Sequence, residues 1–254
     1  NWRRKMGNIG LQLYSIKELT YKDFLGTLEK VAKIGYDGVE FDGYFNTPSG
    51  ELRNALKAFG LKAAGSHSSI EPLINDLDAM IEYSLQIESP YIICSGLPEE
   101  MRNSADVYKR TAELFNKIGR KCKENGLRFG YHNHSDEFEK FDGSFGLDLF
   151  VENTDPELFF IELDTYWVEY TGQKSVDFIE KYKERCSILH IKDLISMEDK
   201  RNTEIGRGCM DFKAITNVGK KYGVEWYTVE QEYFDKPQLQ SIEESLYYLC
   251  GILK

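Results

Sequence analysis

The feature that most constrains this chain is a regular alternation of short β-branched runs with longer amphipathic runs. Eight runs that predict strands begin near Ile9, Gly38, Leu61, Tyr91, Leu127, Leu158, Ser187 and Glu225. Successive starts lie about 31 residues apart, which is the size of one strand–helix unit with its connections. Such a chain pairs its strands with one another and covers them with the intervening helices.

The segments between these runs carry apolar residues at helical spacing. Residues 20–34 predict one helix that begins with Thr20 as its N-cap and stops at Gly35. The same spacing predicts further helices over residues 104–124, 211–222 and 237–252.

Eight such units predict an α/β fold, a single (β/α)8 TIM barrel, over residues 8–254, preceded by an N-terminal extension over residues 1–7. A doubly wound open sheet uses the same units. However, no G-x-G-x-x-G follows the first strand, where Gly10-Leu-Gln-Leu-Tyr-Ser15 stands. Polar residues also recur at the C-terminal ends of the predicted strands, where a barrel builds its site, and this favours the barrel.

Charge and cysteine usage exclude several classes of function. The chain has 32 Lys and Arg against 42 Asp and Glu, a net charge of −10, which argues against a nucleic-acid partner. No apolar stretch is long enough to span a membrane, and no apolar signal segment follows the first residues. The five cysteines form no C-x-x-C pair, so we expect a reducing, cytoplasmic location.

The four histidines of the chain all fall at predicted strand ends. They are His67, His132, His134 and His190. Histidines scattered over a surface would not follow this pattern, so it indicates a site at the C-terminal end of the barrel.

Ionisable residues also alternate along the last four predicted strands. The alternation places His132 with His134 on one face, Glu162 with Asp164, and His190 with Lys192. Inward charged groups are costly unless they are paired or bound to a cation. Two His, one Asp and one Glu that converge would suit Mn²⁺, Zn²⁺ or a similar divalent ion. The alternative is a salt-bridge network, for example between Lys192 and Asp164 or Glu230.

Six segments together resemble the xylose-isomerase-like TIM-barrel superfamily and, within it, the sugar phosphate isomerase/epimerase branch. They are Ile9-Gly-Leu-Gln-Leu-Tyr-Ser15, Tyr131-His-Asn-His134 followed by Glu137-Phe138, Leu163-Asp-Thr-Tyr-Trp167, His190-Ile-Lys-Asp193, Gly206-Arg-Gly-x-x-Asp-Phe212 and Val229-Glu-Gln231. The resemblance runs from about residue 8 to residue 251.

The resemblance implies one divalent metal ion (Mn, Zn, Co or Mg) held by Asp164, His190, Glu230 and a residue of the fifth strand. Ketose 3-epimerases of this superfamily carry a Glu where His132 stands in this chain. Glu137, a little downstream, is the alternative: it either replaces His132 as the ligand or contacts the substrate.

This departure leaves two reactions open. In the epimerases, two metal-bound carboxylates exchange a proton with opposite faces of the substrate, and a ligated imidazole cannot replace one of them as a base. Inosose dehydratases of the superfamily carry a Tyr-His-x-His segment here, so a metal-dependent dehydratase or lyase is the alternative to an isomerase or epimerase. In either case the metal polarises a carbonyl or hydroxyl and stabilises an enediolate. The candidate catalytic residues are Glu230, Lys192 and Glu137.

The implied partner is a small sugar, keto-sugar, sugar phosphate or polyol, and the resemblance also allows a homodimer. The candidate substrate-binding residues are His67, His134, Glu40, Trp167 and Arg207.

Three further interpretations remain. Lys192 on an inward strand could act as a Schiff-base nucleophile in a lyase. The DNA-repair endonucleases of the superfamily need several metals and a basic surface, which four histidines and a charge of −10 disfavour. A non-catalytic sugar-binding barrel stays open because the fifth strand departs from the epimerase pattern.

Overall fold

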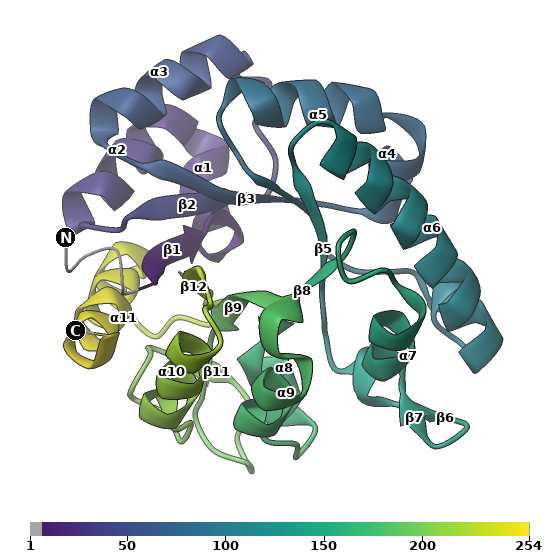
Figure 1. The fold of residues 1–254 in the computed structure, drawn as a ribbon. Coiled ribbons are helices and arrows are strands. Elements are labelled where there is room, and N and C mark those ends of the chain that lie inside the picture. The colour runs from purple at the N-terminus through teal and green to yellow at the C-terminus, as the bar shows by residue number, and fades with distance from the viewer. Residues whose placement is uncertain (1–6, 254) are drawn as a thin grey trace.

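The computed structural model describes residues 7–253, and its centre is a closed barrel of eight parallel strands (Figure 1). The strands are β1 (Asn8–Gln12), β2 (Gly38–Phe41), β3 (Lys62–Ser68), β4 (Tyr91–Cys94), β5 (Arg128–His132), β8 (Phe160–Asp164), β9 (Cys186–Ile191) and β12 (Trp226–Val229). β1 closes the barrel by pairing with both β2 and β12. The predicted (β/α)8 TIM barrel is confirmed, and each strand begins within two residues of its expected start. The predicted extension lies outside the described residues, except for Gly7.

Helices surround the barrel on its outside (Figure 1). The longer ones are α2 (Phe24–Ile34), α3 (Ser49–Phe59), α5 (Leu77–Gln86), α6 (Ala105–Glu124), α7 (Gly146–Asn153), α9 (Ser175–Tyr182), α10 (Phe212–Lys221) and α11 (Gln238–Leu253). Short helices α1 (Lys17–Lys22), α4 (Ile70–Asn75) and α8 (Thr165–Tyr170) lie in the loops, with the strand pairs β6 (Lys140–Phe141)–β7 (Ser144–Phe145) and β10 (Asp193–Leu194)–β11 (Asn202–Thr203). Among the described residues, no helix has the length and apolar character needed to cross a bilayer.

The single helix predicted over residues 20–34 is wrong at its start. The chain forms α1 and α2, and the break lies at Asp23, whose carboxylate accepts a hydrogen bond from Gly26 N at 3.1 Å. Asp23 is therefore the N-cap, and Thr20 lies buried within α1. Apolar spacing continues across the break, so periodicity alone could not reveal it. Gly35 ends α2 as predicted, in a left-handed conformation with φ 111°.

The barrel interior changes from apolar to ionisable along its axis. Along β8, residues Phe160, Glu162 and Asp164 share one face because side chains alternate. Phe160 belongs to a separate apolar cluster, made up of Ala64, Tyr91, Ile93, Phe160, Ile188 and Trp226. Gly130 leaves room for the Phe160 ring, since a Cβ there would lie 2.5 Å from it. Above this floor the inward positions of β8 and β9 carry only ionisable groups, and the candidate site begins there.

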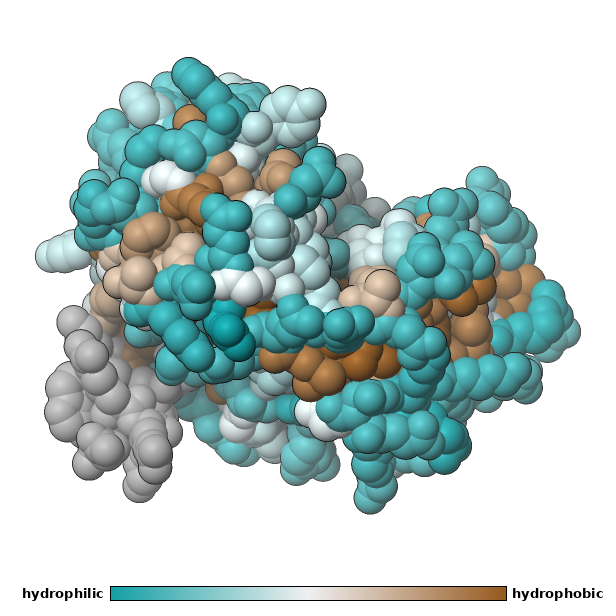
Figure 2. Space-filling model, turned by 90° about the horizontal axis from the view of Figure 1, so that it is seen from above, coloured by the Kyte–Doolittle hydropathy of each residue, from teal (hydrophilic) through white to brown (hydrophobic). Residues whose placement is uncertain are grey.

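The surface shown in Figure 2 is largely hydrophilic, with apolar residues gathered in patches between hydrophilic ones. The large apolar side chains exposed on the described chain are Tyr21, Phe45, Ile74, Leu85, Met197 and Tyr247. The main apolar core lies between the barrel and its helices instead.

Candidate metal centre

The four histidines lie together at the C-terminal ends of the strands. The ring of His132 is central: its centroid lies 4.5 Å from that of His190, 4.9 Å from that of His134 and 5.1 Å from that of His67. These residues come from β3, β5 and β9 and from the loop after β5. The barrel thus gathers residues more than 120 positions apart in sequence, such as His67 and His190.

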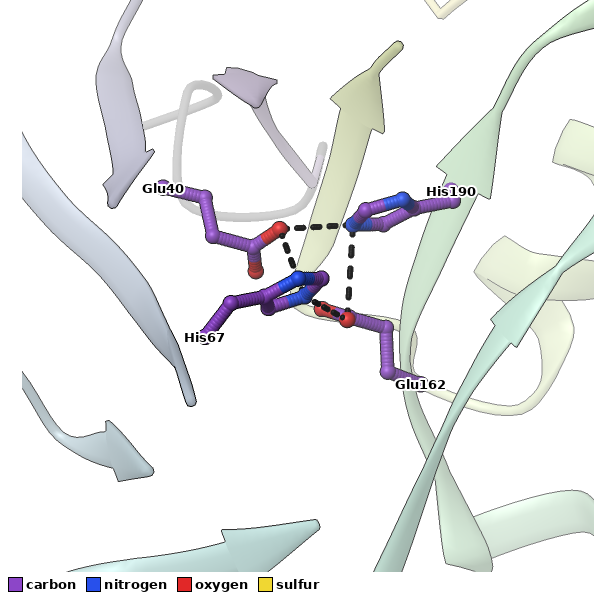
Figure 3. A group of neighbouring side chains, drawn as sticks. All are labelled: Glu40, His67, Glu162 and His190. Carbon is purple, nitrogen blue, oxygen red and sulfur yellow. Dashed lines mark hydrogen bonds and ion pairs between the residues drawn. The ribbon is translucent and has the colours of Figure 1, made fainter. Parts of the chain in front are cut away.

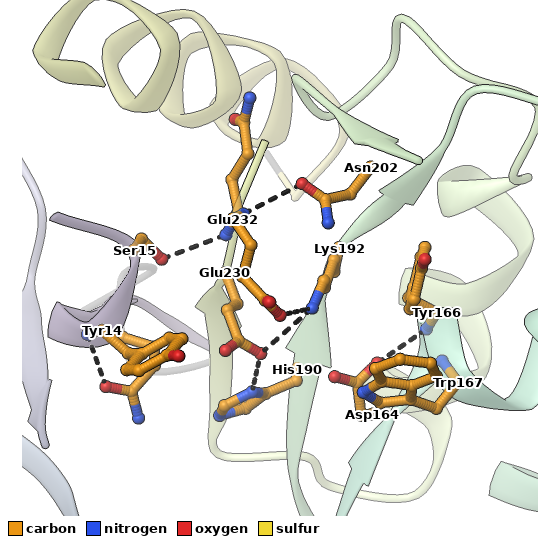
Figure 4. A network of polar contacts seen from close by, with 12 residues as sticks. Tyr14, Ser15, Asp164, Tyr166, Trp167, His190, Lys192, Asn202, Glu230 and Glu232 are labelled. Carbon is orange, nitrogen blue, oxygen red and sulfur yellow. Dashed lines mark hydrogen bonds and ion pairs between the residues drawn. The ribbon is translucent and has the colours of Figure 1, made fainter. Parts of the chain in front are cut away.

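Four buried side chains form what we call the upper group: His132, Asp164, His190 and Glu230. One potential ligand atom from each lies within 4.8 Å of the others. His190 Nδ1 is 3.1 Å from Glu230 Oε2, and His132 Nε2 is 3.4 Å from Asp164 Oδ2. Figure 4 shows His190, Glu230 and Asp164 of this group around Lys192.

Local sequence fixes the direction of the Asp164 carboxylate. Asp164 ends β8 and caps α8: its Oδ1 accepts hydrogen bonds from Tyr166 N at 2.8 Å and Trp167 N at 3.2 Å. Its Oδ2 is buried and has no hydrogen-bond partner among residues 7–253. One oxygen therefore serves the helix, and the other remains available to the upper group.

Among the described residues, His132 has the most buried polar side-chain atoms without a hydrogen-bond partner. Only 3% of the residue is exposed, yet neither ring nitrogen has a hydrogen-bond partner in the described chain. Leaving buried polar atoms unpaired costs free energy. A cation bound between His132 Nε2 and Asp164 Oδ2 would give each of these two atoms a partner. Two imidazole nitrogens and two carboxylates form a donor set that suits Zn²⁺, Mn²⁺ or a similar divalent ion. The upper group therefore fits the implied metal.

The pKa values within the upper group are shifted in opposite directions. Burial raises the pKa of Asp164 to about 7. Burial also acts to raise the pKa of Glu230, but the Lys192 ammonium and His190 outweigh it and lower that pKa to about 2. Burial, followed by the charge of His190, lowers the pKa of His132, which keeps its ring neutral and able to bind a metal. Such clusters of opposed shifts are typical of functional sites.

Lys192 lies directly beside the upper group and is only 1% exposed. Its Nζ donates to the Glu232 carboxylate and lies 4.0 Å from Glu230 Oε2 (Figure 4). The ammonium also lies 4.9 Å from the ring centroid of Tyr166 and 5.3 Å from that of Trp167. Burial acts to lower the pKa of Lys192, but Glu230, Asp164 and Glu232 raise it overall. The charged form is therefore favoured, whereas Schiff-base formation needs the neutral amine.

A second set of side chains, which we call the lower group, lies on the other side of the His190 ring. It consists of Glu40, His67, Glu162 and His190 (Figure 3). His190 Nε2 is 2.6 Å from Glu40 Oε2, and His67 Nε2 is 2.5 Å from Glu162 Oε2. His190 thus faces the upper group with Nδ1 and the lower group with Nε2.

Two residues of the lower group were predicted from the sequence to have another role, and a third was given no role. Glu40 and His67, which were predicted to bind substrate, contact His190 and Glu162 inside the barrel. Glu162 was recognised as inward-facing but given no role, and Gln12, which donates to Glu40 Oε2 at 2.7 Å, was not recognised. The spacing of Glu162 two residues before Asp164 on one face was the available signal.

Glu137 is buried in its own hydrogen-bonded position. Its carboxylate accepts from Tyr131 Oη and from His134 N, each at 2.7 Å. It belongs to neither group, and burial raises its pKa. Of the two candidate fifth-strand ligands, His132 is the one that the fold brings to Asp164.

The remaining candidates lie around the mouth of the barrel. His134 and Glu137 line a cavity of about 520 Å³ together with residues of the loops after β3, β4 and β5. The Trp167 ring lies 5.7 Å from that of His134. Arg207 has a side chain that is 69% exposed, and its ion pair is with Glu244 on α11, at 3.8 Å.

Comparison with known proteins identifies relatives of the whole barrel. A family model described as xylose isomerase-like TIM barrel matches residues 28–251. An inosose dehydratase of Clostridium tetani is 28% identical over 81% of this chain and 80% of its own length. A similar enzyme of Clostridium beijerinckii is 26% identical over 59% of this chain, and that match spans about half (54%) of the relative. A solved sugar phosphate isomerase/epimerase of Parabacteroides distasonis is 28% identical, covers 98% of this chain and 96% of that one, and superposes with a TM-score of 0.81.

Proposed function

Because the chain belongs to the xylose isomerase-like TIM barrel family, we propose that it is a metal-dependent enzyme that moves a proton beside the keto group of a small sugar or polyol. The observation that carries the proposal is the convergence of His132, Asp164, His190 and Glu230 at the C-terminal end of the barrel. In TIM-barrel enzymes, active sites lie at this end. The relatives include an inosose dehydratase and a sugar phosphate isomerase/epimerase, whose names support a substrate of this kind.

Two residues of this chain would carry out the proton transfers. Glu230 is ionised at neutral pH, since its pKa is lowered to about 2, and it accepts the proton from the carbon next to the keto group. Lys192 is held as an ammonium beside it and donates a proton to a departing hydroxyl or to the developing oxyanion. A divalent ion in the upper group would polarise the substrate oxygen and stabilise the negative charge of an enediolate.

The residue in the fifth strand favours dehydration as the outcome. In the upper group, the carboxylate of Glu230 lies next to Lys192 and can act as a base. On β5, where an epimerase would carry a second carboxylate, this chain has the imidazole of His132. One base and one adjacent acid are suited to removing a proton and a hydroxyl from neighbouring carbons. The names of the inosose dehydratase relatives support this assignment.

Epimerisation is the second candidate, supported by the name of the solved sugar phosphate isomerase/epimerase from Parabacteroides. It needs a second base on the opposite face of the substrate. Glu137 would supply that base only if it left the hydrogen bonds from Tyr131 and His134.

His134, Trp167 and the adjoining cavity would hold the substrate. The His134 and Trp167 rings lie side by side near His132, and aromatic faces suit the apolar faces of sugar rings. Glu40 and His67 act on the substrate indirectly in this proposal, because both contact His190. The binding of substrate oxygens or a phosphate by Arg207, and the homodimer, stay predictions.

The proposal is tested by incubating Mn²⁺-loaded protein with an inosose and with a set of keto-sugars. Dehydration yields an unsaturated or diketone product that absorbs in the ultraviolet, whereas epimerisation changes the NMR spectrum without loss of water. We expect the wild type to form the absorbing product only when metal is bound, and the Glu230→Gln variant to form none. Epimers without the absorbing product would favour the second candidate. No conversion of any of these compounds, with metal bound, would contradict the proposed function.

A further inference from the structure

We propose that the lower group of Glu40, His67, Glu162 and His190 is a second divalent-cation site, separate from the upper group. Its four nearest atoms alternate between ring nitrogen and carboxylate oxygen in a closed ring (Figure 3). The sides of this ring measure 2.5, 3.2, 2.6 and 3.4 Å. Ligands bound tetrahedrally 2.0–2.2 Å from one ion lie roughly 3.3–3.6 Å from one another. The two longer sides, of 3.2 and 3.4 Å, are close to this spacing, and the two shorter sides, of 2.5 and 2.6 Å, would have to lengthen when an ion binds.

Ring protons cannot account for all four contacts. The Nε2 atoms of His67 and His190 carry at most one hydrogen each, so at most two hydrogens are available for four nitrogen–oxygen contacts. Gln12 adds a third hydrogen, but it reaches only Glu40 Oε2. At least two of the four contacts therefore bring a nitrogen and an oxygen together without a hydrogen between them. These are the two longer contacts, of 3.2 and 3.4 Å, and a cation at the centre of the ring would bind the atoms of both.

Burial makes this incomplete bonding costly. Glu40, Glu162 and His190 are fully buried, and the side chain of His67 is 8% exposed. Oε1 of Glu40 and Oε1 of Glu162 have no hydrogen-bond partner in the described part of the chain. Two carboxylates with unpaired oxygens so close together repel each other unless positive charge lies between them. Two imidazoles and two carboxylates form a set that binds Zn²⁺ and related ions.

The two sites would share the His190 ring without sharing an atom. Nδ1 faces Glu230 in the upper group, and Nε2 faces Glu40 in the lower group. An ion in the lower group would replace the Nε2 proton of His190 and hold its ring in place, with Nδ1 toward the upper group. With ions in both groups, the ring would lose its second proton to solvent as well and bridge the two ions as an imidazolate. The inference does not depend on the reaction proposed above.

The alternative is a metal-free ion-pair network in which both rings are protonated, and counting bound ions separates the two. The purified protein is stripped with a chelator, reloaded with Zn²⁺, dialysed and analysed for zinc per chain. We expect about two ions in the wild type and about one in Glu162→Gln and in His67→Ala. His132→Ala, which alters only the upper group, should also retain about one. Glu204→Gln removes a buried carboxylate outside both groups and should retain two.

A wild type with one ion, lost in His132→Ala and kept in Glu162→Gln and His67→Ala, would overturn the second site and leave the upper site intact. One ion in the wild type that is kept in His132→Ala and lost in Glu162→Gln and His67→Ala would support the lower site and contradict the proposed metal centre. No zinc in any variant would overturn both. Anomalous scattering from Zn²⁺-loaded wild-type crystals locates the ions directly, so the result does not depend on every variant folding.

Discussion

The side chain of Asn133 holds the main chain of Asp164 by both of its polar atoms. Asn133 Oδ1 accepts from Asp164 N at 3.0 Å, and its Nδ2 donates to Asp164 O at 3.4 Å. Asn133 is completely buried and points away from His132 and His134, its neighbours in sequence. It thus links the end of β5 to the end of β8 behind the upper group, and positions Asp164 without touching the site.

Asn133→Ala should therefore weaken metal binding although Asn133 offers no ligand. Loss of two buried hydrogen bonds should lower the free energy of unfolding by about 1–3 kcal/mol, and misplacing Asp164 should raise the Kd for Mn²⁺ about 10–100-fold. Isothermal titration calorimetry with Mn²⁺ and denaturant unfolding measure the two effects.

Asn116→Ala is the matched control. Asn116 makes the same kind of clamp, donating to Asn153 O at 3.1 Å and accepting from Asp155 N at 2.8 Å, but outside both groups. It should destabilise the protein without changing the Kd for Mn²⁺. Equal Kd values for both variants and the wild type would show that Asn133 has no positioning role.

Lys192→Met should abolish most turnover while the metal stays bound. Methionine fills the position between Tyr166 and Trp167 but cannot donate a proton or balance Glu230. Loss of a general acid lowers kcat by about 10²–10⁴-fold. The measurement is steady-state kinetics together with metal content. Lys181→Met, at a lysine that pairs with Asp148, is the control and should keep wild-type kcat. A Lys192→Met enzyme with wild-type kcat would remove Lys192 from the mechanism.

Stability in acid should depend on Glu204. Burial acts to raise the pKa of its carboxylate, but hydrogen bonds from Ser241 and Thr203 lower it overall, from 4.5 to about 2. A carboxylate with a lower pKa in the folded state stabilises the protein above about pH 4.5, and this contribution is lost as the pH falls toward 2. Glu204→Gln should lower the free energy of unfolding by about 1 kcal/mol at pH 7.

The difference between Glu204→Gln and the wild type should therefore shrink as the pH falls below 4.5. Thermal unfolding of both proteins between pH 3 and 7 measures it. A difference that stays constant over this range would mean that the charge of Glu204 contributes nothing, and that only packing is lost.

Two glycines in helices should respond oppositely to alanine. At Gly119 in α6, a Cβ would lie 2.0 Å from Leu158 O, so Gly119→Ala forces α6 away from the barrel. We expect a loss of about 1–3 kcal/mol despite better helix propensity. Gly251 in α11 has no atom within 4 Å of a Cβ, so Gly251→Ala should be neutral or stabilise by up to about 1 kcal/mol. Chemical denaturation compares them, and equal effects would contradict the proposed packing of α6.

The sequence predicted the barrel well because each strand repeats the same local pattern. Strand starts such as Gly38 and Tyr91 coincide with the observed ones. The break at Asp23 escaped prediction because apolar residues continue on both sides of it, and only the hydrogen bond from Gly26 N reveals the cap.

Alternation on the strands predicted which side chains face inward, and the family resemblance selected Asp164, His190 and Glu230 among them. The lower group could not be predicted, since the depth of a residue inside the barrel depends on register between strands. Glu40 pairs with Gln12 on β1, and Glu162 lies one inward position below Asp164. Contacts such as those of Glu40 with His190, 150 positions apart, follow from closure of the barrel rather than from any local pattern.

The most direct test of the central claim is exchange of a substrate proton with solvent. Metal-loaded protein is incubated with the keto-polyol in D₂O, and NMR follows the proton on the carbon next to the keto group. The account predicts rapid deuterium incorporation by the wild type, and none above background after chelation or in Glu230→Gln. Exchange at the wild-type rate in metal-loaded Glu230→Gln would contradict the assignment of Glu230 as the base of this site.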